Sequence, residues 1–259
     1  MAMKDPDLVI VEEVNWTVRP GDFWVLTGLL GSGKSDFLMM TAGLLSPSAG
    51  EYRLFGELMP IPEGDSMAKR LRVGLVFDGG QLLSHLTVAE NVSLPLRYHQ
   101  DLTGSEAADR TSEALEAMEL SDVAGSLPGG ISRNLQRRAG LARALMLQPE
   151  VLLLDGPLNA LDPRNEIWWL NVLDELSSGH RLCGGRRMTL VATTASLQPW
   201  RGHARSYAIL RDRKLVDLGT WDEVELSNDP AVREFVGSSD RRSDPRDSEL
   251  SNETSDASR

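Results

Sequence analysis

Short apolar runs alternate with helical patterns over residues 8–237 of this 259-residue chain. Runs of four to six residues rich in Val, Leu, Ile and Phe are typical of strands. We expect strands over residues 8–11, 23–26, 51–54, 72–77, 151–154, 189–193, 206–210 and 214–218. The runs VLLL at 151–154 and LVA at 190–192 are apolar throughout, which indicates strands buried on both faces of a parallel sheet. The pattern therefore predicts an α/β fold around a mostly parallel sheet.

Helical patterns lie between these runs. Residues 107–119 and 136–146 have helical character, and residues 166–177 place four apolar side chains on one helical face. From about residue 91 to residue 147 the pattern is helical, with no predicted strand. We therefore predict that a helical subdomain, about residues 85–147, is inserted into the α/β unit.

The last 22 residues, 238–259, have a different composition. They contain six acids, four arginines, no aromatic residue and one large aliphatic residue, Leu250. Such a segment cannot bury enough apolar surface to offset the entropy of ordering it. We predict one folded domain over residues 1–237 and a disordered acidic tail over residues 238–259.

Residues 28–35 read GLLGSGKS and match G-x-x-x-x-G-K-[ST] at every fixed position. They follow the apolar run WVLT and precede the apolar run FLMM, which is the strand–loop–helix context of a phosphate-binding loop. The glycines let backbone N–H groups point at phosphates, Lys34 reaches the β- and γ-phosphates, and the Ser35 hydroxyl binds Mg²⁺. The predicted nucleotide-binding residues are Gly28, Leu29, Leu30, Gly31, Ser32, Gly33, Lys34, Ser35 and Asp36. The motif predicts a P-loop NTPase with ATP and Mg²⁺ as ligands.

Asp36 is an unfavourable neighbour for a phosphate. A carboxylate roughly 5 Å from the α-phosphate costs about 3 kcal/mol at an effective dielectric of about 20. Its attraction to the helix N-terminus returns only about 0.3–1 kcal/mol. Alternatively, Asp36 turns into solvent as an ordinary acid of the first helical turn. In either case we expect reduced nucleotide affinity.

Composition narrows the class of protein. The chain carries 38 acidic and 27 basic residues, a formal net charge of −11. An acidic chain argues against sequence-independent binding of nucleic acid, which needs basic side chains to replace phosphate counterions. The one cysteine, Cys183, excludes an internal disulfide, and no apolar run approaches the roughly 18 residues that span a bilayer. We expect a soluble chain that reaches a membrane only through a partner.

From the phosphate loop onward the chain resembles the nucleotide-binding subunit of an ABC transporter. The resemblance lies in TAGLLSPSAGEYRLFG (41–56), LTVAENVSLPL (86–96), RRAGLARALMLQPEVLLLD (137–155) and LNALDP (158–163). Two further segments, GGQLLSHLTVAENVSLPLR (79–97) and LSNDPAVREFVG (226–237), are most similar to Mla/Mce-type lipid-transport ATPases. The resemblance implies a RecA-like ABC fold and places Asp155, at the end of the Walker B strand, beside Mg²⁺.

Three positions near the predicted nucleotide depart from that family. Gly156 replaces the glutamate that polarises the attacking water, and glycine offers no base. Thr194 replaces the switch histidine, and its hydroxyl lacks the proton chemistry of imidazole. Asp78 replaces the Q-loop glutamine with a shorter, acceptor-only group. We therefore assign no catalytic residue.

The signature segment departs as well. Residues 131–135 (ISRNL) align with the family's LSGGQ; Ser132 is kept, but Arg133 and Asn134 replace both glycines. In the family this segment faces the nucleotide of the second subunit, so these side chains obstruct the approach, although Arg133 can meet a phosphate directly. Little chain precedes Val9, so we also expect the adenine-stacking aromatic of the family to be missing.

These features predict a degenerate ATP-binding subunit of an Mla/Mce-like lipid ABC transporter, which binds ATP weakly or without turnover and acts as a structural or regulatory partner. The expected partners are an integral membrane permease, lipid-transport accessory proteins and a second, active ABC ATPase subunit, in a heterodimer rather than a homodimer. This places the chain at the cytoplasmic face of a membrane, with no nucleic-acid partner. Two alternatives stay open: a hydrolytically active ABC ATPase that uses groups such as Asp78 as base, and a soluble ABC protein outside transport.

Overall fold

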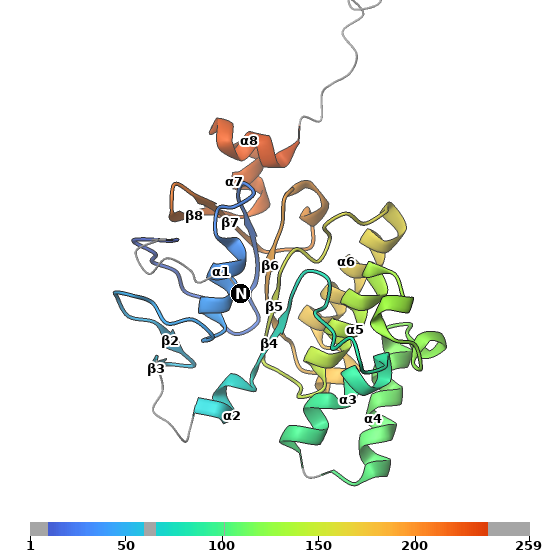
Figure 1. Cartoon of the computed structure of the whole chain (residues 1–259). Coiled ribbons are helices and arrows are strands. Elements are labelled where there is room, and N and C mark those ends of the chain that lie inside the picture. Colours follow the sequence, from blue (N-terminus) through green and yellow to red (C-terminus); the bar gives the residue numbers. More distant parts are fainter. Residues whose placement is uncertain (1–9, 60–65, 101, 238–259) are drawn as a thin grey trace, which may run out of the picture.

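The computed structural model describes residues 10–59, 66–100 and 102–237 (Figure 1). The predicted tail, residues 238–259, lies outside the described residues. Within the described ranges, the chain forms a six-stranded sheet, a separate two-stranded hairpin and helices on both faces of the larger sheet.

The larger sheet has the strand order β4-β5-β6-β1-β7-β8. Its strands are β1 (Phe23–Thr27), β4 (Val73–Val76), β5 (Val151–Leu154), β6 (Thr189–Thr193), β7 (Ser206–Arg211) and β8 (Lys214–Gly219). Neighbours pair in parallel from β4 to β7, and β8 runs antiparallel to β7. The predicted α/β class with a mostly parallel sheet is confirmed.

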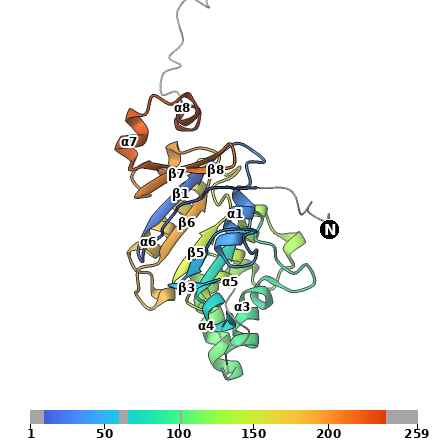
Figure 2. The same cartoon turned by 90° about the vertical axis from the view of Figure 1, so that its left-hand side faces the viewer.

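Helices cover both faces of this sheet (Figure 1, Figure 2). The helices of the described residues are α1 (Lys34–Thr41), α2 (Ser66–Arg70), α3 (Val88–His99), α4 (Gly104–Ala117), α5 (Arg133–Leu145), α6 (Pro163–Ser178), α7 (Trp221–Leu226) and α8 (Pro230–Val236). Single 3₁₀ turns lie at Ser121–Val123, Pro128–Gly130, Arg181–Cys183 and Gln198–Trp200. Among the residues that the structure describes, no helix is long and apolar enough to cross a membrane.

The side chains of β1 alternate between two cores, because successive residues of a strand point to opposite faces. Phe23 and Val25 pack in the larger core, together with buried residues of α3, α5 and α6. Trp24 and Leu26 pack in the smaller core, against α1. The sheet is therefore the middle of three layers, and the loop between β1 and α1 crosses from the sheet to the smaller core.

The helices α3, α4 and α5 form the predicted inserted subdomain between β4 and β5. Thr87 and Thr103 close capping boxes at the starts of α3 and α4, and the Ser132 hydroxyl caps α5. These caps fix the starts of α4 and α5 three residues before the periodicity at 107–119 and 136–146 predicts. The caps lie outside the apolar pattern, which is why periodicity alone misses them.

Two predicted strands are not part of the larger sheet. In the segment 8–11, residues 8 and 9 lie outside the described residues, and residues 10 and 11 belong to no strand. In the segment 51–54, only Arg53–Leu54 forms a strand, β2, in a hairpin with β3 (Glu57–Leu58). Leu54 is the only buried residue of β2 and β3. So little apolar surface cannot fill a central position of a two-faced sheet.

Candidate functional site

The predicted site residues meet at one edge of the sheet. Since β1, β4, β5 and β6 run parallel, their carboxyl ends open on the same side, where α/β sheets bind ligands. The phosphate loop follows β1, and Asp78 lies two residues beyond β4. Asp155 comes directly after β5, and Thr194 directly after β6. The signature segment joins this edge from the start of α5.

The phosphate loop depends on glycine at two close contacts. A Cβ on Gly28, whose φ is +155°, would lie 2.5 Å from the carbonyl oxygen of Leu210 on β7. A Cβ on Gly33, whose φ is +91°, would lie 2.3 Å from Cγ2 of Ile10. Another residue would be strained at both positions, and at Gly28 it would also meet a backbone oxygen, so glycine keeps the bare backbone that a phosphate cradle needs.

The polar side chains of the loop either hydrogen-bond to its own backbone or have no hydrogen-bond partner among the described residues. Lys34 Nζ donates to the carbonyl oxygens of Gly28 at 2.5 Å and Leu29 at 2.9 Å. Ser32 Oγ is buried and has no hydrogen-bond partner in the described part of the chain. The N-cap of α1 is Gly33, so no side chain caps the first N–H groups of that helix. These groups fit the phosphates of ATP, which would take their hydrogen bonds.

The other predicted binding residues differ in what they can offer. Leu30 is fully exposed and Leu29 is 60% exposed, so only their backbone belongs to the cradle. Asp36 is half-buried in the first turn of α1. Burial lowers the pKa of Lys34, and the charge of Asp155 opposes this shift. The loop is therefore electrostatically coupled to the end of β5.

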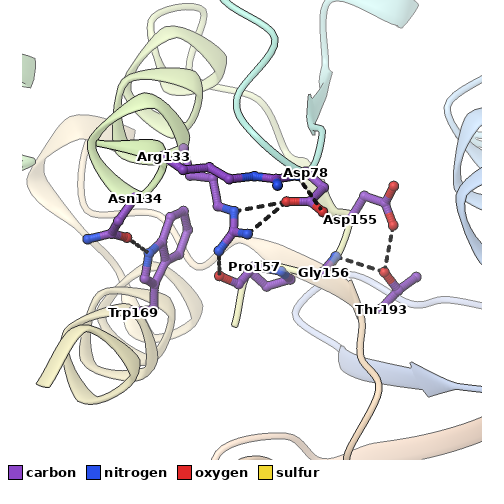
Figure 3. Close-up of polar contacts among 9 residues, drawn as sticks. Asp78, Arg133, Asn134, Asp155, Gly156, Pro157, Trp169 and Thr193 are labelled. Atoms are coloured by element: carbon purple, nitrogen blue, oxygen red, sulfur yellow. Dashed lines mark hydrogen bonds and ion pairs between the residues drawn. The ribbon is translucent and has the colours of Figure 1, made fainter. Parts of the chain in front are cut away.

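Asp155, the predicted Mg²⁺ residue, is fixed by β6 (Figure 3). Thr193 Oγ1 donates to Asp155 Oδ1 at 2.9 Å and accepts the N–H of Gly156 at 2.9 Å. The arrangement fits a water-mediated contact with Mg²⁺, for which Ser35 and the phosphates would supply direct oxygen ligands. The described residues contain no cluster of three or more His, Cys, Asp or Glu side chains that could hold a metal ion.

A side chain at Gly156 would have a left-handed φ and would collide with the Asn159 side chain unless that side chain shifted. Its φ is +58°, and an added Cβ would lie 2.0 Å from Nδ2 and 2.7 Å from Cγ of Asn159. The Asn159 amide thus fills the space beside Gly156. Nothing in the local sequence marks Asn159 as a site residue, because asparagine in a loop is an ordinary turn residue.

Asp78 is engaged by two arginines of α5 (Figure 3). Arg137 donates to Asp78 Oδ1 from Nε at 3.0 Å and approaches it with Nη2 at 2.8 Å, while Arg133 Nη2 donates to Oδ2 at 3.3 Å. A general base needs a carboxylate oxygen aimed at the attacking water, and both oxygens of Asp78 are instead in contact with guanidinium groups. This geometry argues against hydrolysis with Asp78 as base.

The signature segment is bound into the chain's own fold. Ser132 Oγ accepts the N–H of Leu135 at 3.3 Å. Asn134 Oδ1 accepts from Trp169 Nε1 at 2.9 Å (Figure 3). Its Nδ2 donates to Asn165 Oδ1 at 2.6 Å, and both partners lie on α6. Arg133 contacts Asp78 through one exposed hydrogen bond of 3.3 Å. Both residues that replace the family's glycines therefore have partners inside this chain.

Thr194, at the position of the switch histidine, is engaged in a local turn. It is buried, its Oγ1 donates to the carbonyl oxygen of Ser196 at 2.8 Å, and it accepts the N–H of Ser196 at 3.2 Å. The preceding residue, Thr193, is the one that contacts Asp155, and sequence analysis did not single it out. The expected loss of an adenine-stacking aromatic concerns positions before Val9, which lie outside the described residues.

Comparisons with known proteins agree on the family. A family model described as "ABC transporter" matches residues 11–159, more than half of the chain. The spermidine/putrescine import ATP-binding protein PotA of Trichodesmium erythraeum is 32% identical over 228 residues, which cover 88% of this chain and 57% of that protein. The methionine import ATP-binding protein MetN of Caulobacter vibrioides is 35% identical over 229 residues, which cover 86% of this chain and 66% of that protein. The chain thus spans less than two thirds of the length of both relatives.

A solved structure supports the same family. The dimeric, post-hydrolysis structure of an ATP-binding cassette bound to ADP and phosphate aligns with a TM-score of 0.72 and 27% sequence identity, covering 83% of this chain and 92% of that one. The P-loop NTPase fold with an inserted helical subdomain is therefore confirmed, whereas these relatives do not single out the Mla/Mce type. The chain belongs to the ABC transporter family, as an ATP-binding cassette.

Proposed function

We propose that this chain is the ATP-binding subunit of an ABC importer and that it holds ATP and Mg²⁺ without turning ATP over. The contrast between two parts of one site carries this proposal. In the loop 28–35, the Ser32 hydroxyl has no hydrogen-bond partner among the described residues, and no side chain caps α1, so both can take a phosphate. At the end of β5, the base expected at residue 156 is absent, and Asn159 fills the space beside Gly156.

The residues around Gly156 strengthen the second half of the proposal. General-base catalysis needs a free acceptor within hydrogen-bond reach of the attacking water. Both oxygens of Asp78 face arginines, and the Thr194 hydroxyl is engaged by Ser196. The residues that replace the conserved groups of the family therefore offer no second base.

The proposed direction and cargo rest on different grounds. Import follows the names of the relatives, which concern spermidine/putrescine and methionine. Neither name mentions a lipid, so a lipid cargo and the Mla/Mce type rest only on the segments 79–97 and 226–237. We propose on these segments that the cargo is a lipid. Identification of the substrate that the assembled transporter carries would test this.

If this subunit binds ATP without hydrolysing it, another subunit must hydrolyse ATP to drive transport. We propose a heterodimer with a second ABC ATPase subunit, which binds a membrane permease at the cytoplasmic face of the membrane. The dimeric cassette bound to ADP and phosphate supports pairing as such. The support for an unlike partner is the replacement, in this one chain, of both the glutamate and the signature glycines.

A second candidate is a hydrolytically active importer subunit. The similarity to import ATP-binding proteins favours it. It requires a base other than Asp78, because that carboxylate is engaged by Arg133 and Arg137.

The binding half of the proposal is tested by direct titration of the purified chain with ATP and Mg²⁺. We expect Lys34→Ala to weaken ATP binding by at least about 30-fold, or about 2 kcal/mol, because Lys34 is the partly buried cation of the loop. Arg53→Ala removes an exposed cation of the β2–β3 hairpin and serves as the matched control. Equal affinities of the wild type and Lys34→Ala would show that the loop no longer binds nucleotide.

A further inference from the structure

The segment after β4 is held against α5 by arginines at two points. Arg133 and Arg137 contact the two carboxylate oxygens of Asp78. Arg143 donates to the carbonyl oxygens of Gly80 at 2.8 Å and Gln81 at 3.1 Å. The segment 78–81 therefore has side-chain bonds to the first and the last turns of one helix.

The backbones of this segment and α5 also approach closely. A Cβ on Gly140 would lie 2.7 Å from Cα of Gly80. A Cβ on Gly80 would lie 2.1 Å from the carbonyl oxygen of Gln136. Two glycines thus allow a contact that larger residues would prevent, and the segment is packed onto the helix as well as bonded to it.

Arg137 is the central group of this contact. Its side chain is 3% exposed, and besides Asp78 it donates from Nη1 to the carbonyl oxygen of Pro157 at 3.4 Å. Pro157 directly follows Gly156 in the turn after β5. One buried guanidinium group therefore joins three elements: α5, the end of β4 and the end of β5.

We propose that Arg137 is a positioning residue that couples the helical subdomain to the turn 156–161, with Asp78 as its obligatory counter-ion. The measurement with ATP and Mg²⁺ rests on the proposed ATP binding, whereas the measurements without nucleotide do not. In this arrangement Asp78 replaces glutamine because a buried guanidinium group needs a charged partner. The segment 78–81 then moves together with α5 and does not act as a hinge between the subdomain and the sheet.

Burial and exposure separate the roles of the two arginines. Arg133 is 69% exposed and makes one contact of 3.3 Å with Asp78, so it can leave at little cost. Arg137 is buried, and removing one partner of a buried ion pair leaves an uncompensated charge, which is strongly destabilising. The coupling therefore depends on Arg137.

The test compares Asp78→Asn with Glu119→Gln in the full chain without nucleotide. Glu119 pairs with Arg138, another buried arginine of α5, but that pair has no bond to the turn after β5. We expect Asp78→Asn to speed hydrogen exchange of the Asn159 and Leu161 amides, which close this turn, by about 10-fold or more. Glu119→Gln should change the hydrogen-exchange rates of these two amides by less than about 2-fold. Equal effects of the two variants on these amides would overturn the proposal.

A double variant, Asp78→Asn with Arg137→Gln, separates positioning from stability. It removes both charges, so we expect the unfolding equilibrium to recover most of the loss caused by Asp78→Asn. Exchange in the turn 156–161 should stay fast, because the bond to Pro157 is weakened. Recovery of slow exchange in the double variant would contradict a positioning role.

Addition of ATP and Mg²⁺ completes the test. We expect exchange in α3 and α4 of the wild type to stay unchanged and that of Asp78→Asn to change, because only the variant lets the subdomain move separately. A change of similar size in both proteins would overturn the coupling. Absence of Lys34-dependent ATP binding would instead overturn the proposed function and leave the nucleotide-free comparison as the test of Arg137.

Discussion

The phosphate loop and the ends of β4 and β5 differ in how much of their chemistry the chain itself uses. The loop 28–35 bonds mainly to itself, leaves Ser32 Oγ without a partner among the described residues, and exposes Leu30 fully. Beyond β4 and β5, Asp78 pairs with arginines and the Asn159 amide lies against Gly156. Under the proposed function, the loop is open to a nucleotide, whereas Asp78 and the position next to Gly156 are occupied by contacts within the chain.

This difference separates binding from hydrolysis. Where a substitution only removes a catalytic side chain, it leaves an empty space. The reverse substitution would then put the catalytic side chain back without disturbing its neighbours. Here the replacing residues have their own partners: Asn134 contacts Trp169, and Thr194 contacts Ser196. We therefore expect single reversals to the family's residues to destabilise the chain without restoring hydrolysis.

The largest effect is expected from Gly156→Glu, which restores the family's glutamate. A left-handed φ costs about 1–2 kcal/mol for a residue other than glycine, and the collision with Asn159 adds about 1–3 kcal/mol. Chemical denaturation should show a loss of about 2–5 kcal/mol in the free energy of unfolding. In the double variant with Asn159→Ser, the part of this loss that comes from the collision should be recovered. A stable Gly156→Glu variant with restored ATP turnover would break the contrast between the two regions.

Asn134→Gly, which restores a signature glycine, is expected to cost about 2–3 kcal/mol. It removes the acceptor of the Trp169 indole N–H, which is fully buried, and adds the entropic cost of glycine in a helix. Thermal and urea unfolding measure the loss. The control Asn171→Gly lies on the exposed face of α6 and should cost less than about 1 kcal/mol. Equal losses in both variants would mean that Asn134 has no structural role.

The buried thiol of Cys183 makes the stability of the folded chain depend on pH. Burial raises the pKa of this thiol to about 11, from an ordinary value of 9.0. The unfolded chain loses the thiol proton first, so stability is unaffected below about pH 9 and falls as pH rises from about 9 to 11, by roughly 2–3 kcal/mol. Urea titrations at a series of pH values measure the free energy of unfolding of the wild type and of Cys183→Ser. Their difference gives the pH-dependent contribution of the thiol. Parallel pH curves would contradict burial of the thiol.

The smallest effect is expected at Asp36. Its carboxylate lies in the first turn of α1, next to the predicted phosphate position. We expect Asp36→Asn to tighten ATP binding by about 10-fold, an effect that shrinks at high salt. The control Asp109→Asn, on the exposed face of α4, should leave affinity unchanged. Unchanged affinity in Asp36→Asn would place this carboxylate away from the nucleotide.

The periodic and glycine-rich parts of the chain were predictable from local sequence. The runs at β5 and β6 predict buried parallel strands, and GLLGSGKS predicts the phosphate loop. The partners of the altered residues were not predictable, because they come from distant segments. Arg137 meets Asp78 across 59 residues, and Asn134 meets Trp169 across 35. A charged residue in a helix is normally solvated, so nothing in the local pattern marks Arg137 as buried.

One measurement tests the central claim most directly: the isolated chain is loaded with ATP and Mg²⁺, and bound nucleotide and released phosphate are followed in the same sample. We predict Lys34-dependent binding of nucleotide that remains ATP, with turnover well below about 1 s⁻¹. Release of ADP and phosphate above about 1 s⁻¹, abolished by Lys34→Ala, would contradict the claim that this chain binds ATP without hydrolysing it.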